Sequence, residues 1–129
     1  LAYSKIAKGL LGEGRLNLMQ PTVFLEDPAA ARSLARKAIK IYMPLENYHR
    51  AWRERGFEDA DFKDGGSDAF IDALIPWGSS ATINAAYRQQ IAQGVGHIIM
   101  TPLGLDLDQD SGWQTISALT QSLKGSGAA

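Results

Sequence analysis

Two short apolar runs, far apart in the chain and separated by helical patterns, constrain the fold more than any other feature. The first lies near 18–25 and contains Pro21, as in a buried strand that begins or bends at a proline. The second, at 97–101, is rich in β-branched residues and lies between Gly96 and Pro102. Because strands that alternate with amphipathic helices form parallel sheets, the sequence predicts an α/β fold, rich in helices, with few parallel strands.

The first helix is expected directly after the first strand, where Asp27 can cap it and Pro28 has the backbone angle of a first helical turn. Pro44 removes a backbone donor and disfavours helical geometry before it, so this helix should end or kink at 43–44. Apolar residues at three- and four-residue steps predict its buried side, namely Ala31, Leu34, Ala35, Ala38, Ile41 and Tyr42.

More helical segments are expected before the second strand and one after it. The first runs over 46–55, and the acidic stretch 57–66 after it is typical of a turn or single helical turn followed by a loop. Serines can cap the next two helices: Ser67 the first, and Ser79 or Ser80 the second. A capping box at 111–114 predicts the last helix, with these residues facing inward: Trp113, Ile116, Leu119 and Leu123. A partial helical stripe over 1–11 suggests that the chain begins inside or just before a helix, and 125–129 is expected to be a flexible tail.

Composition excludes several classes of protein and of site. Thirteen basic and fourteen acidic side chains give a net charge of -1, which provides no field to attract nucleic acid or anionic lipid. The absence of cysteine excludes disulfides, thiolate nucleophiles and zinc-thiolate sites. No apolar run approaches the roughly 18 residues that span a bilayer, so we expect a cytoplasmic protein that binds neither nucleic acid nor membrane.

Five segments, taken in order, resemble a known family. They are FLEDPAAAR (24–32), YMPLENY (42–48), RGFEDAD (55–61), DGGSD (64–68) and DALIPWG (72–78). This ordered set is similar to the C-terminal half of the luciferase-like monooxygenases and, within that superfamily, to the deazaflavin-dependent oxidoreductases. The similarity extends from Arg15 to about Thr101. Family members often carry a Leu-Pro-Asn-Tyr string in the middle helix, whereas this chain reads Met-Pro-Leu-Glu-Asn-Tyr over 43–48.

The resemblance implies the C-terminal portion of a (β/α)8 TIM barrel of the bacterial-luciferase-like type. Residues 1–124 would form a partial barrel that contains its last two strands, with 44–78 as a helical insertion or lid. A complete barrel needs roughly 250 residues, so the chain alone should be inactive and should pair with a missing N-terminal half or with a second copy. In the intact oxidoreductase or monooxygenase, FMN or the deazaflavin coenzyme F-420 would carry out hydride transfer or oxygen activation on a small organic substrate.

Four residues are candidates for contact with cofactor or substrate, while the catalytic residues stay unknown. Glu26 and Thr101 follow the two strands, where barrel enzymes place their functional groups. Asn47 and Tyr48 lie in the expected lid, although Tyr48 can equally serve in packing.

Other polar and aromatic residues have structural interpretations that outweigh the functional ones. Asp27 is explained by helix capping, and Trp77 is more easily an anchor for the lid than a pocket wall. Neither His49 nor His97 has a second metal ligand at a suitable spacing, so no metal site is expected. The acidic residues of 58–68 lack the order of a calcium loop and are expected to be solvated.

One alternative leaves catalysis out. The chain can instead be a helical α/β interaction module whose apolar faces pair with a second copy or with a partner chain.

Overall fold

The computed structural model describes residues 16–125, and the expected helical stripe at 1–11 and residues 126–129 of the expected tail lie outside them. Within the described residues, two strands form a parallel sheet, β1 (Asn17–Val23) and β2 (His97–Leu103). The helices, in chain order, are α2 (Pro28–Ile39), α3 (Glu46–Glu54), the 3-10 helix η1 (Asp59–Gly65), α4 (Asp68–Leu74), α5 (Ser80–Ala92) and α6 (Asp110–Gly125). The prediction of a helix-rich α/β fold with few parallel strands is therefore confirmed.

The two strands pair in register from Asn17 opposite His97 to Val23 opposite Leu103. Strand β2 extends two residues beyond the expected 97–101 and includes Pro102. A proline is tolerated there because β2 pairs on one side only within the described part of the chain, and an edge strand can lose a donor. Pro21 lies inside β1 for the same reason.

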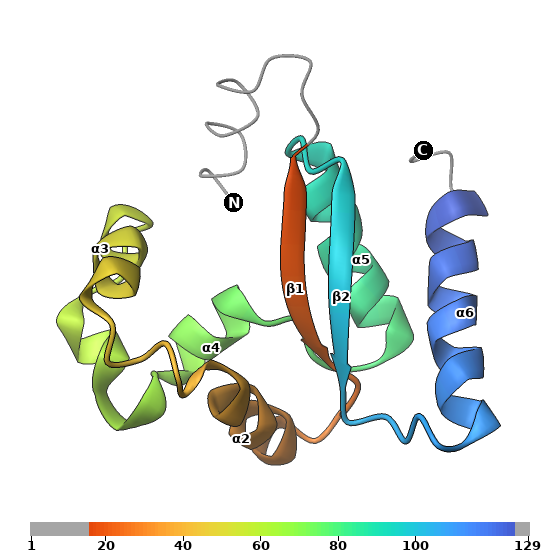
Figure 1. Ribbon diagram of the computed structural model, residues 1–129, viewed down its shortest axis with the longest axis horizontal. Coiled ribbons are helices and arrows are strands. Elements are labelled where there is room, and N and C mark those ends of the chain that lie inside the picture. Colours follow the sequence, from red (N-terminus) through yellow and green to blue (C-terminus); the bar gives the residue numbers. More distant parts are fainter. Residues whose placement is uncertain (1–15, 126–129) are drawn as a thin grey trace.

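Helices cover one face of the sheet, and the other face is open except at its carboxyl end, where Val23 is buried in the core with α2 and α4. Figure 1 shows α5 behind the strands and no described helix in front of them. On the covered face, the Thr22 hydroxyl contacts the Tyr87 hydroxyl of α5, and the Gln90 amide donates to Gln20 Oε1 at 2.8 Å. On the open face, Met19 is 74% exposed and its register partner Ile99 is 43% exposed.

The larger hydrophobic core lies beside the sheet rather than on it. It joins the end of β1 to α2, α3 and α4, and its buried members are Val23, Ala31, Ala35, Ile39, Trp52, Phe70, Ile71 and Ile75. Aromatic rings dominate its centre, where the Phe70 ring lies 4.9 Å from that of Trp52 and 5.1 Å from that of Phe57. Segment 44–78, expected as an insertion or lid, thus supplies much of this core.

Two expected helix faces were wrong. Helix α2 ends at Ile39 and its C-cap is Lys40, so Ile41 and Tyr42 lie in the following turn, 69% and 37% exposed. At the other end of the chain, α6 begins at Asp110, before the expected capping box. Trp113 is therefore 56% exposed, and its indole nitrogen donates to the Leu107 carbonyl at 2.8 Å instead of packing inward.

The caps predicted for α2, α4 and α5 are present. Asp27, Ser67 and Ser79 each accept a hydrogen bond from the backbone nitrogen three residues later, at 2.9, 3.1 and 3.2 Å. Gly94 follows α5 with a φ of 103°, a left-handed conformation that suits glycine. None of the helices in the described range is long and apolar enough to cross a membrane.

Candidate functional site at the strand ends

Three segments converge where the strands end. The Val23 nitrogen donates to the Pro76 carbonyl at 2.9 Å, and the Gly78 nitrogen donates to the Val23 carbonyl at 3.1 Å. This single parallel bridge between Val23 and Trp77 places segment 76–78 beside β1, on the side away from β2. Parallel sheets bind their ligands beyond the carboxyl ends of the strands, so a ligand site is expected at this junction.

A pocket of about 460 Å³ opens at this junction. Glu26 borders it after β1, Trp77 forms part of its wall, and Ser79 and Thr82 contribute hydroxyls from the start of α5. The Ser79 and Thr82 hydroxyl oxygens lie 3.1 Å apart. Glu26 makes no hydrogen bond or ion pair with another described residue, which leaves its carboxylate available to a ligand.

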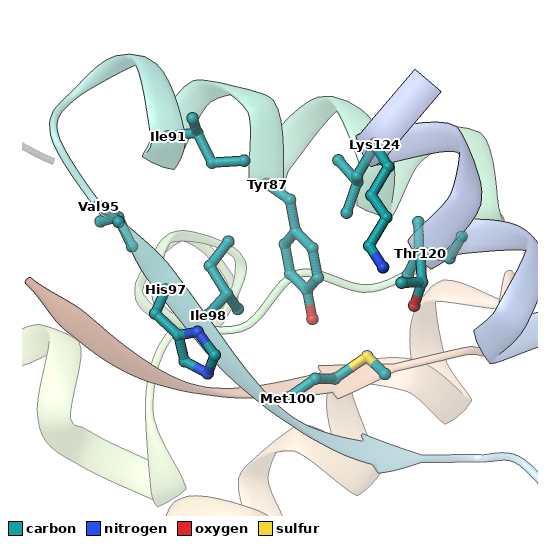
Figure 2. A pocket seen from close by; sticks show the side chains of 11 residues that line it. Tyr87, Ile91, Val95, His97, Ile98, Met100, Thr120 and Lys124 are labelled. Carbon is teal, nitrogen blue, oxygen red and sulfur yellow. The ribbon is translucent and has the colours of Figure 1, made fainter. Parts of the chain in front are cut away.

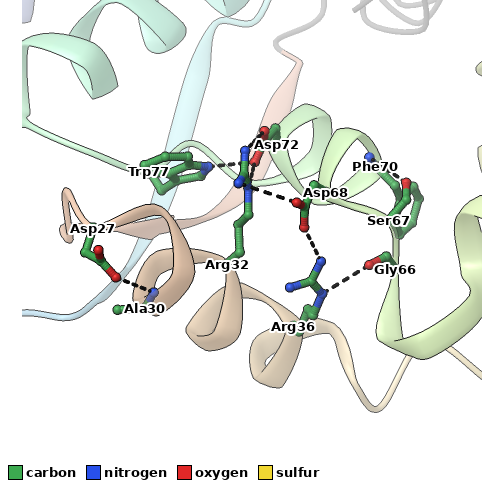
Figure 3. A network of polar contacts seen from close by, with 10 residues as sticks. All are labelled: Asp27, Ala30, Arg32, Arg36, Gly66, Ser67, Asp68, Phe70, Asp72 and Trp77. Atoms are coloured by element: carbon green, nitrogen blue, oxygen red, sulfur yellow. Dashed lines mark hydrogen bonds and ion pairs between the residues drawn. The ribbon is translucent and has the colours of Figure 1, made fainter.

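Asp72 is the other carboxylate at this pocket, and it is fully engaged (Figure 3). The Arg32 guanidinium donates to both of its oxygens, at 3.0 and 2.7 Å, and the Trp77 indole nitrogen donates at 2.8 Å. The hydrogen bonds from Arg32 lower the pKa of Asp72 most, partial burial opposes them, and the bond from Trp77 lowers it further. Arg32 also lies 5.3 Å from the centre of the Trp77 ring. Trp77 is thus tied to α2 and α4, as the anchoring interpretation expects.

This network was not predicted, although the sequence contains a signal for it. Arg32 and Arg36 are four residues apart on α2, and Asp68 and Asp72 are four apart on α4. Arg36 binds Asp68 at 2.6 Å while Arg32 binds Asp72, so the pairs form in reverse chain order (Figure 3). Two matched i, i+4 charge pairs in reverse order indicate two helices that pack side by side in opposite directions.

The structure does not bring the four candidate residues together. Glu26 lines the pocket at the strand ends, and Thr101 lies exposed on the open face of β2. Asn47 is exposed on α3, which Figure 1 shows on the far side of α4 from the sheet. Tyr48 packs its ring 4.9 Å from that of Tyr42 and 5.7 Å from that of Trp52. This environment favours the packing interpretation of Tyr48.

Both histidines have structural surroundings. The His49 ring lies 4.7 Å from Phe62, and its Nε2 contacts the Met43 carbonyl, which joins the turn after α2 to the aromatic core. His97 is exposed at the start of β2, in register with Asn17.

Three carboxylates of the acidic stretch 58–68 have hydrogen-bond or ion-pair partners, namely Asp59, Asp61 and Asp68, although Asp59 and Asp68 are also exposed to solvent as expected. Arg53 binds Asp59 at 2.7 Å. The Glu58 backbone nitrogen and the Ser67 hydroxyl donate to Asp61, and these two bonds lower its pKa against partial desolvation. Across residues 16–125, no group of three or more His, Cys, Asp or Glu side chains could hold a metal ion.

The chemistry of the strand-end pocket suits hydroxyl, amide or cationic groups. It offers one free carboxylate, two hydroxyls and part of an indole. No Lys or Arg lines it within the described residues, so it does not fit the phosphate of a flavin or deazaflavin. On the open face, the described residues Met19, Ile99 and Thr101 expose two apolar side chains and one hydroxyl and supply no anion-binding group.

Comparison of the chain with protein-family models, with curated proteins and with solved structures gives no match.

Proposed function

We propose that the chain is the C-terminal part of a cytoplasmic luciferase-like oxidoreductase that uses FMN or the deazaflavin coenzyme F-420. In this proposal β1 and β2 are two neighbouring strands of a (β/α)8 barrel wall, and other residues complete the ring. The complete enzyme acts on a small organic substrate by hydride transfer or oxygen activation. The ordered sequence segments between 24 and 78 are the reason for naming this family.

The difference between the two faces of the sheet is the main support for the proposal. Every strand in a barrel wall has helices outside and the barrel interior on its other face. Here Ile98 and Met100 face α5 and α6, while Met19 and Ile99 on the opposite face are exposed. Two apolar side chains left side by side on a sheet are costly in water, and a barrel interior would cover them.

The proposal gives Glu26 and Thr101 the role of orienting the ligand. The Glu26 carboxylate would accept hydrogen bonds from a substrate or from the ring edge of the cofactor. Thr101, on the same face as Met19 and Ile99, would contact a ligand that lies over that face. The cofactor supplies the redox chemistry when bound. Its phosphate would be held by residues outside the described part, since the strand-end pocket has no cation.

A second candidate function rests on the same open face. A non-catalytic interaction module would cover Met19 and Ile99 with a second copy of itself or with a partner chain, and would bind no cofactor. The two proposals differ in what lies over the sheet, a ligand-binding barrel interior or another protein surface.

Titration of the complete gene product with FMN and with F-420, followed by quenching of cofactor fluorescence, tests the enzyme proposal. We expect saturable binding of one cofactor, and weaker binding of cofactor or substrate in Glu26→Gln. Glu54→Gln, which removes a carboxylate from the end of α3, should bind like the unchanged protein and is the matched control. Failure of both cofactors to bind contradicts the proposal and leaves the interaction module.

A further inference from the structure

A second cavity lies on the covered side of the sheet, between α5, β2 and α6 (Figure 2). Its volume is about 490 Å³, which falls within the roughly 300–1,000 Å³ typical of small-molecule sites. Ile98 and Met100 form its floor, and these side chains face away from the open face that carries Met19 and Ile99. It is therefore separate from the strand-end pocket and from the open face.

The walls of this groove are apolar. Ile91 of α5 and Leu119 of α6 both line the groove beside the floor formed by β2. Tyr87 contributes its ring, because its hydroxyl is already engaged by the Thr22 hydroxyl. A ligand in this groove must have a large apolar part, since few polar groups of the walls can reach it.

One cation distinguishes the mouth of the groove. Figure 2 shows the Lys124 amine extending toward the space between Tyr87 and Thr120. Lys124 makes no ion pair with another residue of the described range, and no Asp or Glu lines the groove there. An uncompensated ammonium beside an apolar groove is complementary to a molecule with one anionic end.

We propose that this groove binds an elongated apolar molecule with an anionic head group, of the alkyl carboxylate class. The alkyl chain lies between α5, α6 and the floor of β2, where it covers the apolar walls that water now contacts. The carboxylate lies at the mouth, where the Lys124 amine donates to it, while the Thr120 hydroxyl donates to the Ile116 carbonyl at 2.9 Å within α6. The site is independent of the cofactor proposed for the open face.

Calorimetric titration of the full chain with three amphiphiles of equal length tests this inference. The probes are dodecanoate, dodecanol and dodecyltrimethylammonium, each kept below its critical micelle concentration. We expect dodecanoate to bind most tightly and the cationic amphiphile most weakly. Lys124→Gln should weaken dodecanoate binding about three- to fivefold, as befits a solvent-exposed ion pair, and leave dodecanol unchanged. Lys37→Gln, at an exposed lysine of α2, is the matched control and should change neither.

Ile91→Trp tests the position of the alkyl chain, because an indole there fills the groove. It should abolish binding of dodecanoate and dodecanol, with folding checked by circular dichroism. Since Lys124 is exposed, Lys124→Gln decides the head-group position even if Ile91→Trp destabilises the chain.

Equal affinity for all three amphiphiles would overturn the proposal. So would dodecanoate binding that is unchanged in both Lys124→Gln and Ile91→Trp. Absence of binding of all three amphiphiles would also overturn the proposal, and two further measurements would then distinguish the alternative occupants of the groove. A dimer that Ile91→Trp converts to monomer would show that a second copy fills the groove. Binding that begins only after deletion of residues 1–12 would assign the groove to the chain's own amino-terminal segment.

Discussion

The two hydrophobic clusters of this molecule differ in how completely they are built. The cluster around α2, α3 and α4 surrounds Phe70 with the rings of Trp52, Phe57 and Phe62, at centroid distances of 4.9 to 5.5 Å. The cluster between the sheet, α5 and α6 has three buried members, Ile83, Tyr87 and Leu119, and borders an open groove. One region closes on itself, while the other leaves a groove beside α5 and α6 and exposed side chains on the opposite face of the sheet.

The difference indicates where the described chain needs something more. Polar contacts reinforce the closed region, since the two Arg–Asp pairs join α2 to α4. In the open region, the polar links between α5 and α6 are hydrogen bonds rather than ion pairs: the Asn84 amide donates to the Ser122 hydroxyl at 2.5 Å, and the Arg88 guanidinium donates to the Ser122 carbonyl at 3.4 Å. We therefore expect the helical region to dominate the stability of the isolated chain, and the sheet region to gain most from a ligand or partner.

The largest expected effect comes from truncating the centre of the closed region. Phe70→Ala removes a ring that is fully buried among three others, and should lower the free energy of unfolding by about 3–5 kcal/mol. Leu119→Ala, in the open region, should cost only about 2 kcal/mol because the neighbouring groove already admits water. Urea unfolding followed by circular dichroism measures both. A loss for Leu119→Ala equal to that for Phe70→Ala would break the comparison.

A smaller effect is expected at the polar link between α5 and β1. Tyr87→Phe removes one partner of Thr22, whose hydroxyl still donates to the Gln20 carbonyl at 3.2 Å, so the loss should be about 0.5–1.5 kcal/mol. Tyr42→Phe, in the exposed turn, should change stability by less than about 0.5 kcal/mol. Urea unfolding of both variants is the measurement, and an equal loss in the two would show that the buried contact contributes nothing.

The same tyrosine adds an alkaline dependence. Burial raises the pKa of Tyr87, which the hydrogen bond with Thr22 partly offsets. A raised pKa in the folded state stabilises the protein below the ordinary pKa of about 10, and this contribution is lost as the pH rises further. Tyr87→Phe should lack that alkaline loss of stability.

The ion pairs of the closed region should make its stability depend on acid pH. The pKa of Asp72 is lowered in the folded state. Its contribution to the free energy of unfolding is therefore present above the ordinary pKa of about 4, and it is lost as the pH falls through the lower pKa of the folded state. Asp72→Asn keeps an acceptor for Trp77 but removes the charge. It should cost about 0.5–1 kcal/mol near neutral pH, and the difference from the unchanged protein should shrink below about pH 4. Urea unfolding as a function of pH measures this, with Glu54→Gln as control, and a difference independent of pH would contradict it.

Local sequence signals predicted the elements well because each is set by neighbouring residues. Asp27, Ser67 and Ser79 cap the helices that their positions predicted, and both strands formed where apolar runs suggested them. The partners of these elements were harder to predict. The bridge between Val23 and Trp77 depends on the path of the whole segment between them, and no local pattern encodes it.

Tertiary context also explains the misplaced side chains. Ile41 and Tyr42 fit the apolar period of α2, but the helix ends before them and the chain turns away toward α3. At the strand-end pocket, the position of Glu26 after β1 was predictable from chain order. Asp72 and Arg32 were not, because their roles depend on how α4 crosses α2.

The open face of the sheet should show the smallest effect on stability and a clear effect on association. Met19→Glu with Ile99→Glu places charges on side chains that are 74% and 43% exposed, so the free energy of unfolding should change by no more than about 0.5 kcal/mol. An apolar sheet face promotes self-association, so sedimentation velocity should show oligomers of the unchanged chain and a larger monomer fraction in the variant. Lys37→Glu with Lys40→Glu places two acidic residues near the end of α2 instead, and should leave the oligomers intact. If the unchanged chain is instead a compact monomer, the open face is stable in contact with water. The contrast between the closed and the open region would then reflect a difference in packing and not the absence of a neighbouring chain or ligand.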